Sequence, residues 1–497
     1  MKKSKLLFIA LILPLLYGCN TQNSSNSENI VTSTSVEENN NGLNVIYVSP
    51  KGEATNSGSK ESPLDAFSAM NRLNKGGRII LLEGTYSLTS TLRVTRDSEK
   101  NSGVGVASKE EERKYMTPEK KEDGTYVDVL FDFSQMAYAS SNRGISLDSD
   151  YWTVEGFKVK GAGDNGIYIG GNYNIVSQME TFECRDTGLQ LGRSFSNYET
   201  IDTWPSNNLI INCTSYDNHD PTGEDSDGFA CKLTTGYNNV FDGCIAYNNV
   251  DDGWDLYTKG ESGPIGPVTL KNCVAFNNGI TTGGIGTANS DGNGFKLGGE
   301  SIAVNHTVIN CVAFNNLATG FTDNSNPGTI YFENCTAFNN GSRDEDGYNF
   351  STCRDRATSL NSYKNCLSFS IGEKVNPITK EKNINNSKDA YKGSASYCAF
   401  FNSLSSLYIG SMQEVDYDVE ALRGTLFEDL ENPFVSITTP QEQSFKGEAV
   451  ENKVDIHKVL RNKDGSVNLG DFLKLKDESK FKTMGENNSP LGANLHN

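Results

Sequence analysis

The sequence predicts an all-β fold, a right-handed parallel β-helix, because two short motifs recur along much of its length. The first motif is Asn-Cys-x-(Ala/Ser)-(Tyr/Phe)-x-Asn, and the second is a glycine followed by two apolar residues that flank one variable residue. Short strands of alternating character, separated by Asn and Gly turns at a regular period, are typical of stacked solenoid coils. The glycines of the second motif are Gly166, Gly188, Gly228, Gly253, Gly294, Gly320 and Gly347.

The first residues are typical of a bacterial export signal. Three lysines stand among the first five residues, an apolar run follows over residues 6–17, and Cys19 comes next after a glycine. This order predicts a signal over residues 1–18, which is too short to span a bilayer permanently, and lipidation of Cys19. Residues 19–42 are rich in Ser, Asn, Thr and Glu and predict a flexible tether. We therefore expect an exported protein, lipid-anchored at the cell surface or outer membrane, with no other membrane contact.

The charge of the chain restricts its partners. The formal net charge is −19 over 497 residues. This charge excludes nucleic acid as a partner, because phosphate binding needs a basic surface. An acidic substrate is disfavoured too, unless a bound cation mediates the contact. We expect a monomer.

The eleven cysteines could form disulfides in an exported chain. However, six of them recur at one position of the first motif, and Cys184 fits the same phase. Equivalent positions in stacked coils would align as a ladder of small apolar side chains, so we expect buried thiols. The spacing does not suit a zinc site. The six cysteines are Cys213, Cys244, Cys273, Cys311, Cys335 and Cys366.

The domain boundaries follow from where the repeat begins and ends. Residues 43–370 are expected to form the β-helix, and a short amphipathic helix within residues 62–70 is expected to cap its N-terminal end. Residues 95–125 are charged and irregular, which predicts a surface loop. The repeat decays beyond residue 370, so residues 371–497 are expected to be an irregular C-terminal segment packed on the helix.

Four aspartates are predicted to converge on two neighbouring coils. Asp227 and Asp252 each precede a motif glycine, so they occupy equivalent positions one coil apart, about 4.8 Å. Asp251 comes one residue earlier, and Asp255 alternates with two apolar residues and should point outward into solvent. Such a cluster would repel itself unless a hard cation were bound, and calcium takes six to eight oxygen ligands in flexible geometry. The alternative is a solvated acidic stripe on an acidic protein.

Lys296 occupies the position of Asp255 one coil further on. A lysine close to a cation fits a proton-abstracting base, because the cation and partial desolvation both lower its pKa. The alternative is a salt bridge from Lys296 to Asp255.

Two long insertions flank this group, one between Gly188 and Gly228 and one between Gly253 and Gly294. Insertions in solenoids often build the binding face. The first carries aromatic and basic residues that suit a charged sugar, although Trp204 could simply be buried. The expected substrate-binding residues are Arg193, Lys232 and Lys259, and Phe195 and Tyr198 accompany them in the first insertion.

Five stretches of the chain resemble polysaccharide lyase family 9. They are WPSNNLIINC from residue 204, DSDGFACKL from 225, YNNVDDGWDLYTK from 247, GNGFKLGG from 292 and TDNSNPG from 322. The similarity covers about residues 45–370 and part of the C-terminus. It implies a pectate-lyase-like fold, a calcium ion held by four aspartates and a lysine base. The four aspartates match Asp227, Asp251, Asp252 and Asp255, and the base matches Lys296.

The resemblance implies calcium-assisted β-elimination of a galacturonate-containing pectin. Calcium would compensate the C6 carboxylate of a uronate, and Lys296 would remove the C5 proton as the C4 oxygen leaves. The product would be a 4,5-unsaturated sugar. The substrate could be homogalacturonan or rhamnogalacturonan I, the general acid is not identified, and endo or exo action stays open.

Two other functions fit the same fold. A polygalacturonase-like hydrolase would also use carboxylates, but it would not need Lys296 and would work in the presence of a chelator. A non-catalytic glycan-binding surface lipoprotein would keep the aspartates for calcium without requiring the lysine.

Overall fold

The computed structural model describes residues 42–94, 107–341, 348–352, 361–371, 394–400, 407–409, 424, 426, 431–439 and 460–496. The predicted signal over residues 1–18, Cys19 and all but the last residue of the tether lie outside these ranges. Within the described ranges, no helix is both long and apolar enough to cross a membrane.

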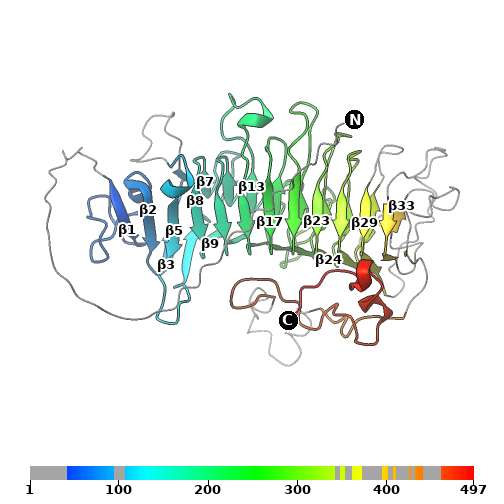
Figure 1. Cartoon of the computed structure of the whole chain (residues 1–497). Coiled ribbons are helices and arrows are strands. Elements are labelled where there is room, and N and C mark those ends of the chain that lie inside the picture. Colours follow the sequence, from blue (N-terminus) through cyan, green and yellow to red (C-terminus); the bar gives the residue numbers. More distant parts are fainter. Residues whose placement is uncertain are drawn as a thin grey trace, which may run out of the picture. The chain divides into compact units, whose positions relative to one another are not determined.

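Almost every strand pairs in parallel with the equivalent strand of the next coil, and the pairs build three sheets (Figure 1). Sheet A contains β1 (Leu43–Val48), β2 (Leu73–Leu81), β5 (Lys114–Pro118), β8 (Trp152–Glu155), β11 (Ile175–Ser177), β14 (Leu209–Ile211), β17 (Asn239–Asp242), β20 (Val268–Lys271), β23 (Thr307–Ile309), β26 (Tyr331–Glu333), β29 (Ser362–Lys364) and β31 (Ser394–Ser396). Sheet B contains β3 (Gly84–Ser87), β6 (Val129–Asp132), β9 (Lys158–Lys160), β12 (Glu180–Phe182), β15 (Thr214–Tyr216), β18 (Ile245–Tyr247), β21 (Val274–Phe276), β24 (Val312–Phe314), β27 (Thr336–Phe338), β30 (Leu367–Phe369) and β32 (Ala399–Phe400). Sheet C contains β4 (Leu92–Val94), β7 (Ile145–Leu147), β10 (Ile167–Ile169), β13 (Leu189–Leu191), β16 (Phe229–Cys231), β19 (Trp254–Asp255), β22 (Phe295–Lys296), β25 (Phe321–Thr322), β28 (Phe350–Thr352) and β33 (Leu407–Ile409). The predicted parallel β-helix is confirmed.

In the part of the chain that the structure describes, helices are few and short. The expected N-terminal helix is α1 (Ala66–Met70), where Asp65 caps the first turn by accepting from Ser68 N at 2.9 Å. Ala69 is fully buried in the main core. The helix itself is confirmed, whereas its role in capping the solenoid stays a prediction. The 3₁₀ helices are η1 (Glu110–Glu112), η2 (Ile201–Thr203), η4 (Lys480–Lys482) and η5 (Glu486–Asn488).

An aromatic stack lies inside sheet C, directly behind the predicted site. Consecutive coils contribute one ring each, with neighbouring ring centroids 4.7–4.9 Å apart. All five side chains are fully buried, so their packing holds the short strands of sheet C in register. The stack consists of Phe229, Trp254, Phe295, Phe321 and Phe350.

The cysteine ladder is confirmed, with one correction. Every described cysteine is a buried free thiol, whereas Cys353 lies outside the described residues. The six motif cysteines stand between a sheet A strand and a sheet B strand. Cys398 extends their row by one coil, because its Sγ accepts from the backbone N–H of Cys366 at 3.3 Å. The expectation that Cys184 shares this phase is wrong, because Cys184 follows β12, and Met179 occupies the ladder position in that coil.

Cys184 instead stands at the head of a second ladder, made of asparagines, in the turn from sheet B to sheet C. Its backbone N–H donates to Asn218 Oδ1 at 3.1 Å. Each following amide donates to the next asparagine, as in the 3.0 Å bond from Asn249 Nδ2 to Asn278 Oδ1. The side chains of stacked asparagines therefore bond to one another along the axis of the solenoid. The ladder contains Asn218, Asn249, Asn278, Asn316, Asn340 and Asn349.

The motif glycines are required by this ladder. A Cβ at Gly253 would lie 2.5 Å from the carbonyl oxygen of Gly294 and 2.9 Å from Asn278 Nδ2. Both distances are shorter than van der Waals contact, so the close approach of the next coil excludes a side chain there. The glycine and the asparagine of one turn are thus parts of one packing arrangement.

Two boundaries differ from the expectation. The expected surface loop at residues 95–125 contains β5, which takes a regular place in sheet A between β2 and β8. Parallel pairing also continues past residue 370, because β31, β32 and β33 extend the three sheets. The repeat motifs weaken there while the register of the strands is kept.

The described C-terminal residues pack on the outer face of sheet B. Phe472 contacts both Phe314 and Phe338 edge-on, with ring centroids 4.8 and 5.9 Å apart. Arg461 donates to Cys213 O at 2.7 Å and to Gly243 O at 2.9 Å, which joins the segment to two coils.

Candidate active site

The candidate site lies where the chain passes from sheet B into sheet C. Asp227, Asp251 and Asp252 end this turn in two successive coils, and Asp255 lies within β19. Lys296 lies within β22 and is the register partner of Asp255. All five predicted residues therefore come from three adjacent coils, as the alignment of the glycine motif predicted.

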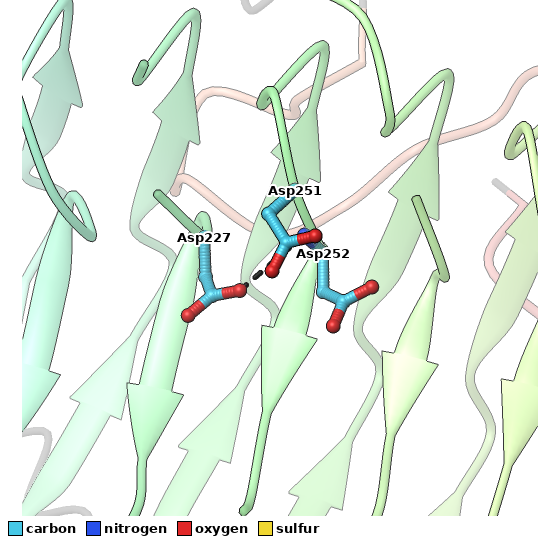
Figure 2. Close-up of side chains that lie close together, drawn as sticks. All are labelled: Asp227, Asp251 and Asp252. Carbon is cyan, nitrogen blue, oxygen red and sulfur yellow. Dashed lines mark hydrogen bonds between the residues drawn. The ribbon is translucent and has the colours of Figure 1, made fainter. Parts of the chain in front are cut away.

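Three of the four aspartates form one compact group (Figure 2). Asp227, Asp251 and Asp252 each place one carboxylate oxygen within 4.8 Å of the others. Asp227 Oδ1 also accepts from the backbone N–H of Asp252 at 3.3 Å, which links the two coils.

Neighbouring residues orient these carboxylates. Asp252 Oδ1 accepts from the backbone N–H of Asn293 at 2.6 Å and from its side-chain amide at 3.0 Å. Asp251 Oδ1 accepts from the backbone N–H of Asp291 at 2.6 Å. The next coil thus fixes the direction of two carboxylates, which preorganises the group.

The predicted exposure of the site is wrong. Asp227 and Asp252 are fully buried, and Asp255 is 5% exposed. The turn that carries Asp251 and Asp252 is short, whereas the corresponding turns of the two flanking coils are long. Those long turns contact each other, since Thr287 Oγ1 donates to Thr222 O at 3.2 Å, and they meet across the short turn.

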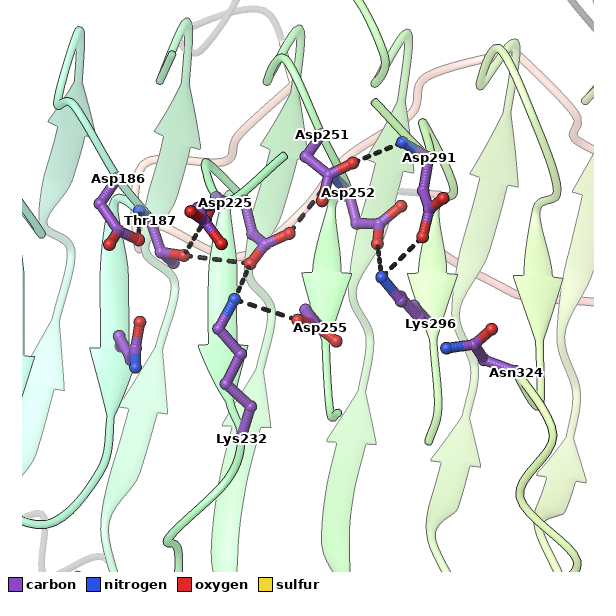
Figure 3. Close-up of polar contacts among 12 residues, drawn as sticks. Asp186, Thr187, Asp225, Lys232, Asp251, Asp252, Asp255, Asp291, Lys296 and Asn324 are labelled. Atoms are coloured by element: carbon purple, nitrogen blue, oxygen red, sulfur yellow. Dashed lines mark hydrogen bonds and ion pairs between the residues drawn. The ribbon is translucent and has the colours of Figure 1, made fainter. Parts of the chain in front are cut away.

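Asp255 does not join the compact group directly. Its side chain lies on the outer face, as predicted from the buried Trp254 and Leu256 on either side. Its Oδ2 lies 3.0 Å from the ammonium of Lys232, which also lies 2.7 Å from Asp227 Oδ2 (Figure 3). Lys232 therefore bridges two of the four aspartates.

Lys296 pairs with carboxylates other than Asp255, which was its partner in the alternative interpretation. Its Nζ lies 2.7 Å from Asp291 Oδ2 and 3.2 Å from Asp252 Oδ2, and no ion pair with Asp255 is found among the described residues (Figure 3). Burial lowers the pKa of Lys296, but the surrounding aspartates, Asp252 foremost, raise it well above its ordinary value. The lowering of this pKa that was expected beside a bound cation stays a prediction, because the raised pKa is that of the protein without the ion.

The carboxylates themselves resist ionisation. Burial, together with the charge of neighbouring aspartates, raises the pKa of Asp252 to about 7, although Lys296 opposes the shift. The same two causes raise the pKa of Asp251 and Asp227 well above the ordinary value. Burial is the largest cause of these shifts, and Lys232 and Lys296 oppose them.

Two buried carboxylate oxygen atoms are suited to a cation ligand. Asp255 Oδ1 accepts no hydrogen bond from any described residue, and neither does Asp252 Oδ2, which has only the ion pair with Lys296 at 3.2 Å. Buried carboxylate oxygens are normally satisfied, because an unsatisfied one carries the full cost of desolvation. Oxygen donors from several carboxylates suit calcium, so the residues present fit this ion.

The other residues predicted to bind substrate lie apart from the carboxylates. Arg193 lies in the turn after β13, beyond the opposite end of sheet C, and its guanidinium donates to Tyr198 O at 3.3 Å. Trp204 is buried, with its indole N–H donating to the same carbonyl at 2.9 Å. Lys259 is exposed and forms a bridge with Gly263. Each predicted insertion is thus divided between the two turns that flank sheet C.

The sequence interpretation missed three residues of the site. Asp291 pairs with Lys296, Asn293 orients Asp252, and Thr187 Oγ1 donates to Asp227 Oδ2 at 3.0 Å. Thr187 and Asn293 each directly precede a motif glycine, the same position as Asp227 and Asp252. The alignment of coils could have found them, had it been extended beyond acidic residues.

Known proteins match this chain in sequence and in fold. A family model described as the Pel9A-like, right-handed β-helix region matches residues 46–376. The chain belongs to this family, polysaccharide lyase family 9. It is a polysaccharide lyase, and its β-helix is right-handed.

Individual relatives agree with this assignment. The chain is 39% identical over 454 residues to pectate lyase L of Paenibacillus polymyxa (strain SC2), a match that covers 90% of this chain and 85% of that protein. It is 44% identical over 324 residues to a pectate lyase L of Thermoclostridium stercorarium, covering 64% of this chain and 24% of that protein. The crystal structure of pectate lyase Pel9A matches with a TM-score of 0.65 at 25% identity, over 92% of this chain and 97% of that one.

Proposed function

We propose that this polysaccharide lyase cleaves the galacturonate backbone of pectin by calcium-dependent β-elimination, with Lys296 as the base. The observation that carries the proposal is the buried group of carboxylates beside Lys296, a buried lysine that is the register partner of Asp255. The names of the relatives, which are pectate lyases, favour homogalacturonan over rhamnogalacturonan I as the substrate.

Asp227, Asp251, Asp252 and Asp255 would hold the calcium ion. When bound, calcium would neutralise the C6 carboxylate of the substrate and make the C5 proton more acidic. It also reconciles an acidic protein with an acidic polysaccharide. The same positive charge would offset the carboxylates that keep Lys296 protonated in the ion-free protein.

Lys296 would take the C5 proton in its neutral form. Its side chain is 11% exposed, which limits its access to water while leaving its ammonium within reach of the outer face. Asp291 Oδ2, 2.7 Å away, can hold the ammonium once it has formed. The electron pair of the C5–H bond forms the C4–C5 double bond, and the C4 oxygen leaves.

The products distinguish this proposal from hydrolysis. Purified protein should be incubated with homogalacturonan, rhamnogalacturonan I and alginate in the presence of calcium, and the fragments weighed by mass spectrometry. Elimination predicts non-reducing ends lighter by one water than those from hydrolysis. Fragments that contain an added water would contradict the proposal, and cleavage of rhamnogalacturonan I alone would replace the substrate.

We also propose that the protein is exported and anchored through lipid on Cys19, acting as a monomer. The support is the sequence of residues 1–18 and the polar stretch over residues 19–42. Mass spectrometry of the N-terminal peptide from the membrane fraction should find a diacylglyceryl group on Cys19, and Cys19→Ala should release the protein from that fraction.

A further inference from the structure

Lys232 occupies an unusual place between two predicted calcium ligands. It directly follows β16, and its side chain runs back toward the aspartate turn (Figure 3). Its Nζ lies 2.7 Å from Asp227 Oδ2 and 3.0 Å from Asp255 Oδ2, and only 12% of the side chain is exposed. A single ammonium therefore joins carboxylates from two adjacent coils.

The residues of β16 leave room for the Lys232 side chain on the outer face of sheet C. Phe229 and Cys231 point into the core, so Ala230 and Lys232 share the outer face of sheet C. Ala230 is the register partner of Asp255, and its methyl group is the smallest side chain that could stand there. A larger residue at this position would project from the same face, between Lys232 and the carboxylates.

The ammonium and a divalent cation compete for the same oxygen atoms. Asp227 Oδ2 already accepts from Lys232 and from Thr187 Oγ1, and Asp255 Oδ2 is engaged by Lys232 as well. Two positive charges within a few ångströms in a buried site repel each other strongly. A cation that binds Asp227 and Asp255 would therefore displace Lys232 from at least one of them.

We propose that Lys232 is an internal counter-ion, which holds Asp227 and Asp255 in the ion-free protein, is displaced when calcium binds, and then pairs with a carboxylate of the polysaccharide. The last step rests on the function proposed above, whereas the first two concern the protein and the ion alone. Its flexible four-carbon stem and its place on the outer face leave the displaced ammonium beside the bound sugar. Calcium binding and substrate binding are then coupled, and each strengthens the other.

Calcium affinity without sugar tests the first two steps. Isothermal titration calorimetry should compare the wild type with Lys232→Met and Lys232→Gln. Removal of the competing ammonium should lower the Kd for calcium by about tenfold or more, since each tenfold is about 1.4 kcal/mol. An unchanged Kd would show that Lys232 is not displaced, and a raised Kd would show that it supports the site. Either result would overturn the proposal.

Lys364→Met is the matched control. Lys364 also bridges two carboxylates, with Nζ 2.6 Å from Glu486 and 3.4 Å from Glu333, but it lies in sheet A. Its removal should leave the calcium Kd unchanged. Thermal unfolding of each variant, followed by circular dichroism, shows that the affinities belong to folded protein, and the Gln variant serves if the Met variant does not fold.

The third step has its own readout. At saturating calcium, Lys232→Met should bind an oligogalacturonate several-fold more weakly than the wild type. If calcium tightens as expected but the wild type binds no oligogalacturonate, the proposed substrate fails and the displacement stands. If the wild type cleaves pectate normally but the calcium Kd of Lys232→Met is not lowered, the displacement fails and the proposed function stands.

Discussion

Asp255 and Lys296 are register partners on the adjacent strands β19 and β22, yet their side chains engage different groups. Asp255 pairs with Lys232, and Lys296 pairs with Asp252 and Asp291. The lysine is thereby held next to the carboxylate group without being paired to its own neighbour in the sheet. This arrangement leaves Asp255 Oδ1 without a hydrogen bond from any described residue, as a cation ligand requires.

Asp252→Asn should weaken calcium binding by at least about tenfold, because the side chain loses its charge while it keeps its shape. Turnover at limiting calcium should fall accordingly. Calorimetric titration measures the affinity directly. Asp242→Asn is the control, because Asp242 also accepts from an asparagine of the next coil, Asn272, but lies in sheet A. Equal calcium affinities for the two variants would remove Asp252 from the site.

Calcium affinity should rise with pH through neutrality. The pKa of Asp252 is about 7 in the ion-free protein, raised first by burial, so below this pH the carboxyl is protonated and must lose its proton to bind the ion. The apparent Kd should then increase by about tenfold for each pH unit below 7 if one proton is displaced. Titrations at about pH 5, 6, 7 and 8, one pH unit apart, check the slope. A Kd independent of pH over this range would contradict the raised pKa.

Lys296→Arg should fold and bind calcium but lose turnover by about 10²–10⁴-fold, the usual contribution of a general base. A guanidinium can keep the ion pairs with Asp252 and Asp291, but it stays protonated. Lys296→Ala should lose as much, and the residual rate should no longer rise with pH. For the wild type, the rate should rise into the alkaline range, because only the neutral amine accepts a proton. An arginine variant with substantial activity would place the base elsewhere.

The positions of these residues could be predicted from the sequence because a solenoid converts sequence period into spatial proximity. The register match between Asp255 and Lys296 on adjacent strands followed from their common distance after a glycine. Contacts made by long side chains could not be predicted in this way, since Lys232 reaches back along its strand to Asp227. The burial of the site could not be predicted from the repeat period either, because it depends on a contact between two long turns across a shorter one.

Cys184 shows a second limit of the same reasoning. The residue type alone predicts the place of a cysteine in the coil, but cysteines occur in two different turns. The motif cysteines lie between sheets A and B, whereas Cys184 lies between sheets B and C. The hydrogen bonds distinguish the two rows: Cys184 N–H donates to Asn218 Oδ1, whereas Met179 O accepts from Thr214 N–H.

His306 predicts an acid-sensitive step in stability. It is fully buried, its Nδ1 accepts from Val268 N at 3.1 Å, and burial lowers its pKa to about 3. Above the unfolded value of about 6.5, both states are neutral and the residue has no pH effect. Below it, only the unfolded state takes the proton, so folding should lose about 1.4 kcal/mol per pH unit until the folded pKa is reached.

His306→Asn should remove this slope. Asn174, Asn208 and Asn239 accept backbone bonds in comparable turns, so an asparagine can replace the imidazole acceptor. Urea unfolding at neutral and mildly acidic pH gives the free energy of unfolding for both proteins. Their difference should change with pH in favour of the variant as the pH falls, and parallel profiles would refute the assignment.

The most direct test of the central claim is the ultraviolet absorbance of the 4,5-unsaturated product during incubation with homogalacturonan. The wild type should produce this absorbance with calcium, lose it completely in excess chelator, and regain it when calcium is restored in excess. Full activity in chelator, or cleavage of the polymer without the absorbance of the new double bond, would contradict calcium-dependent β-elimination.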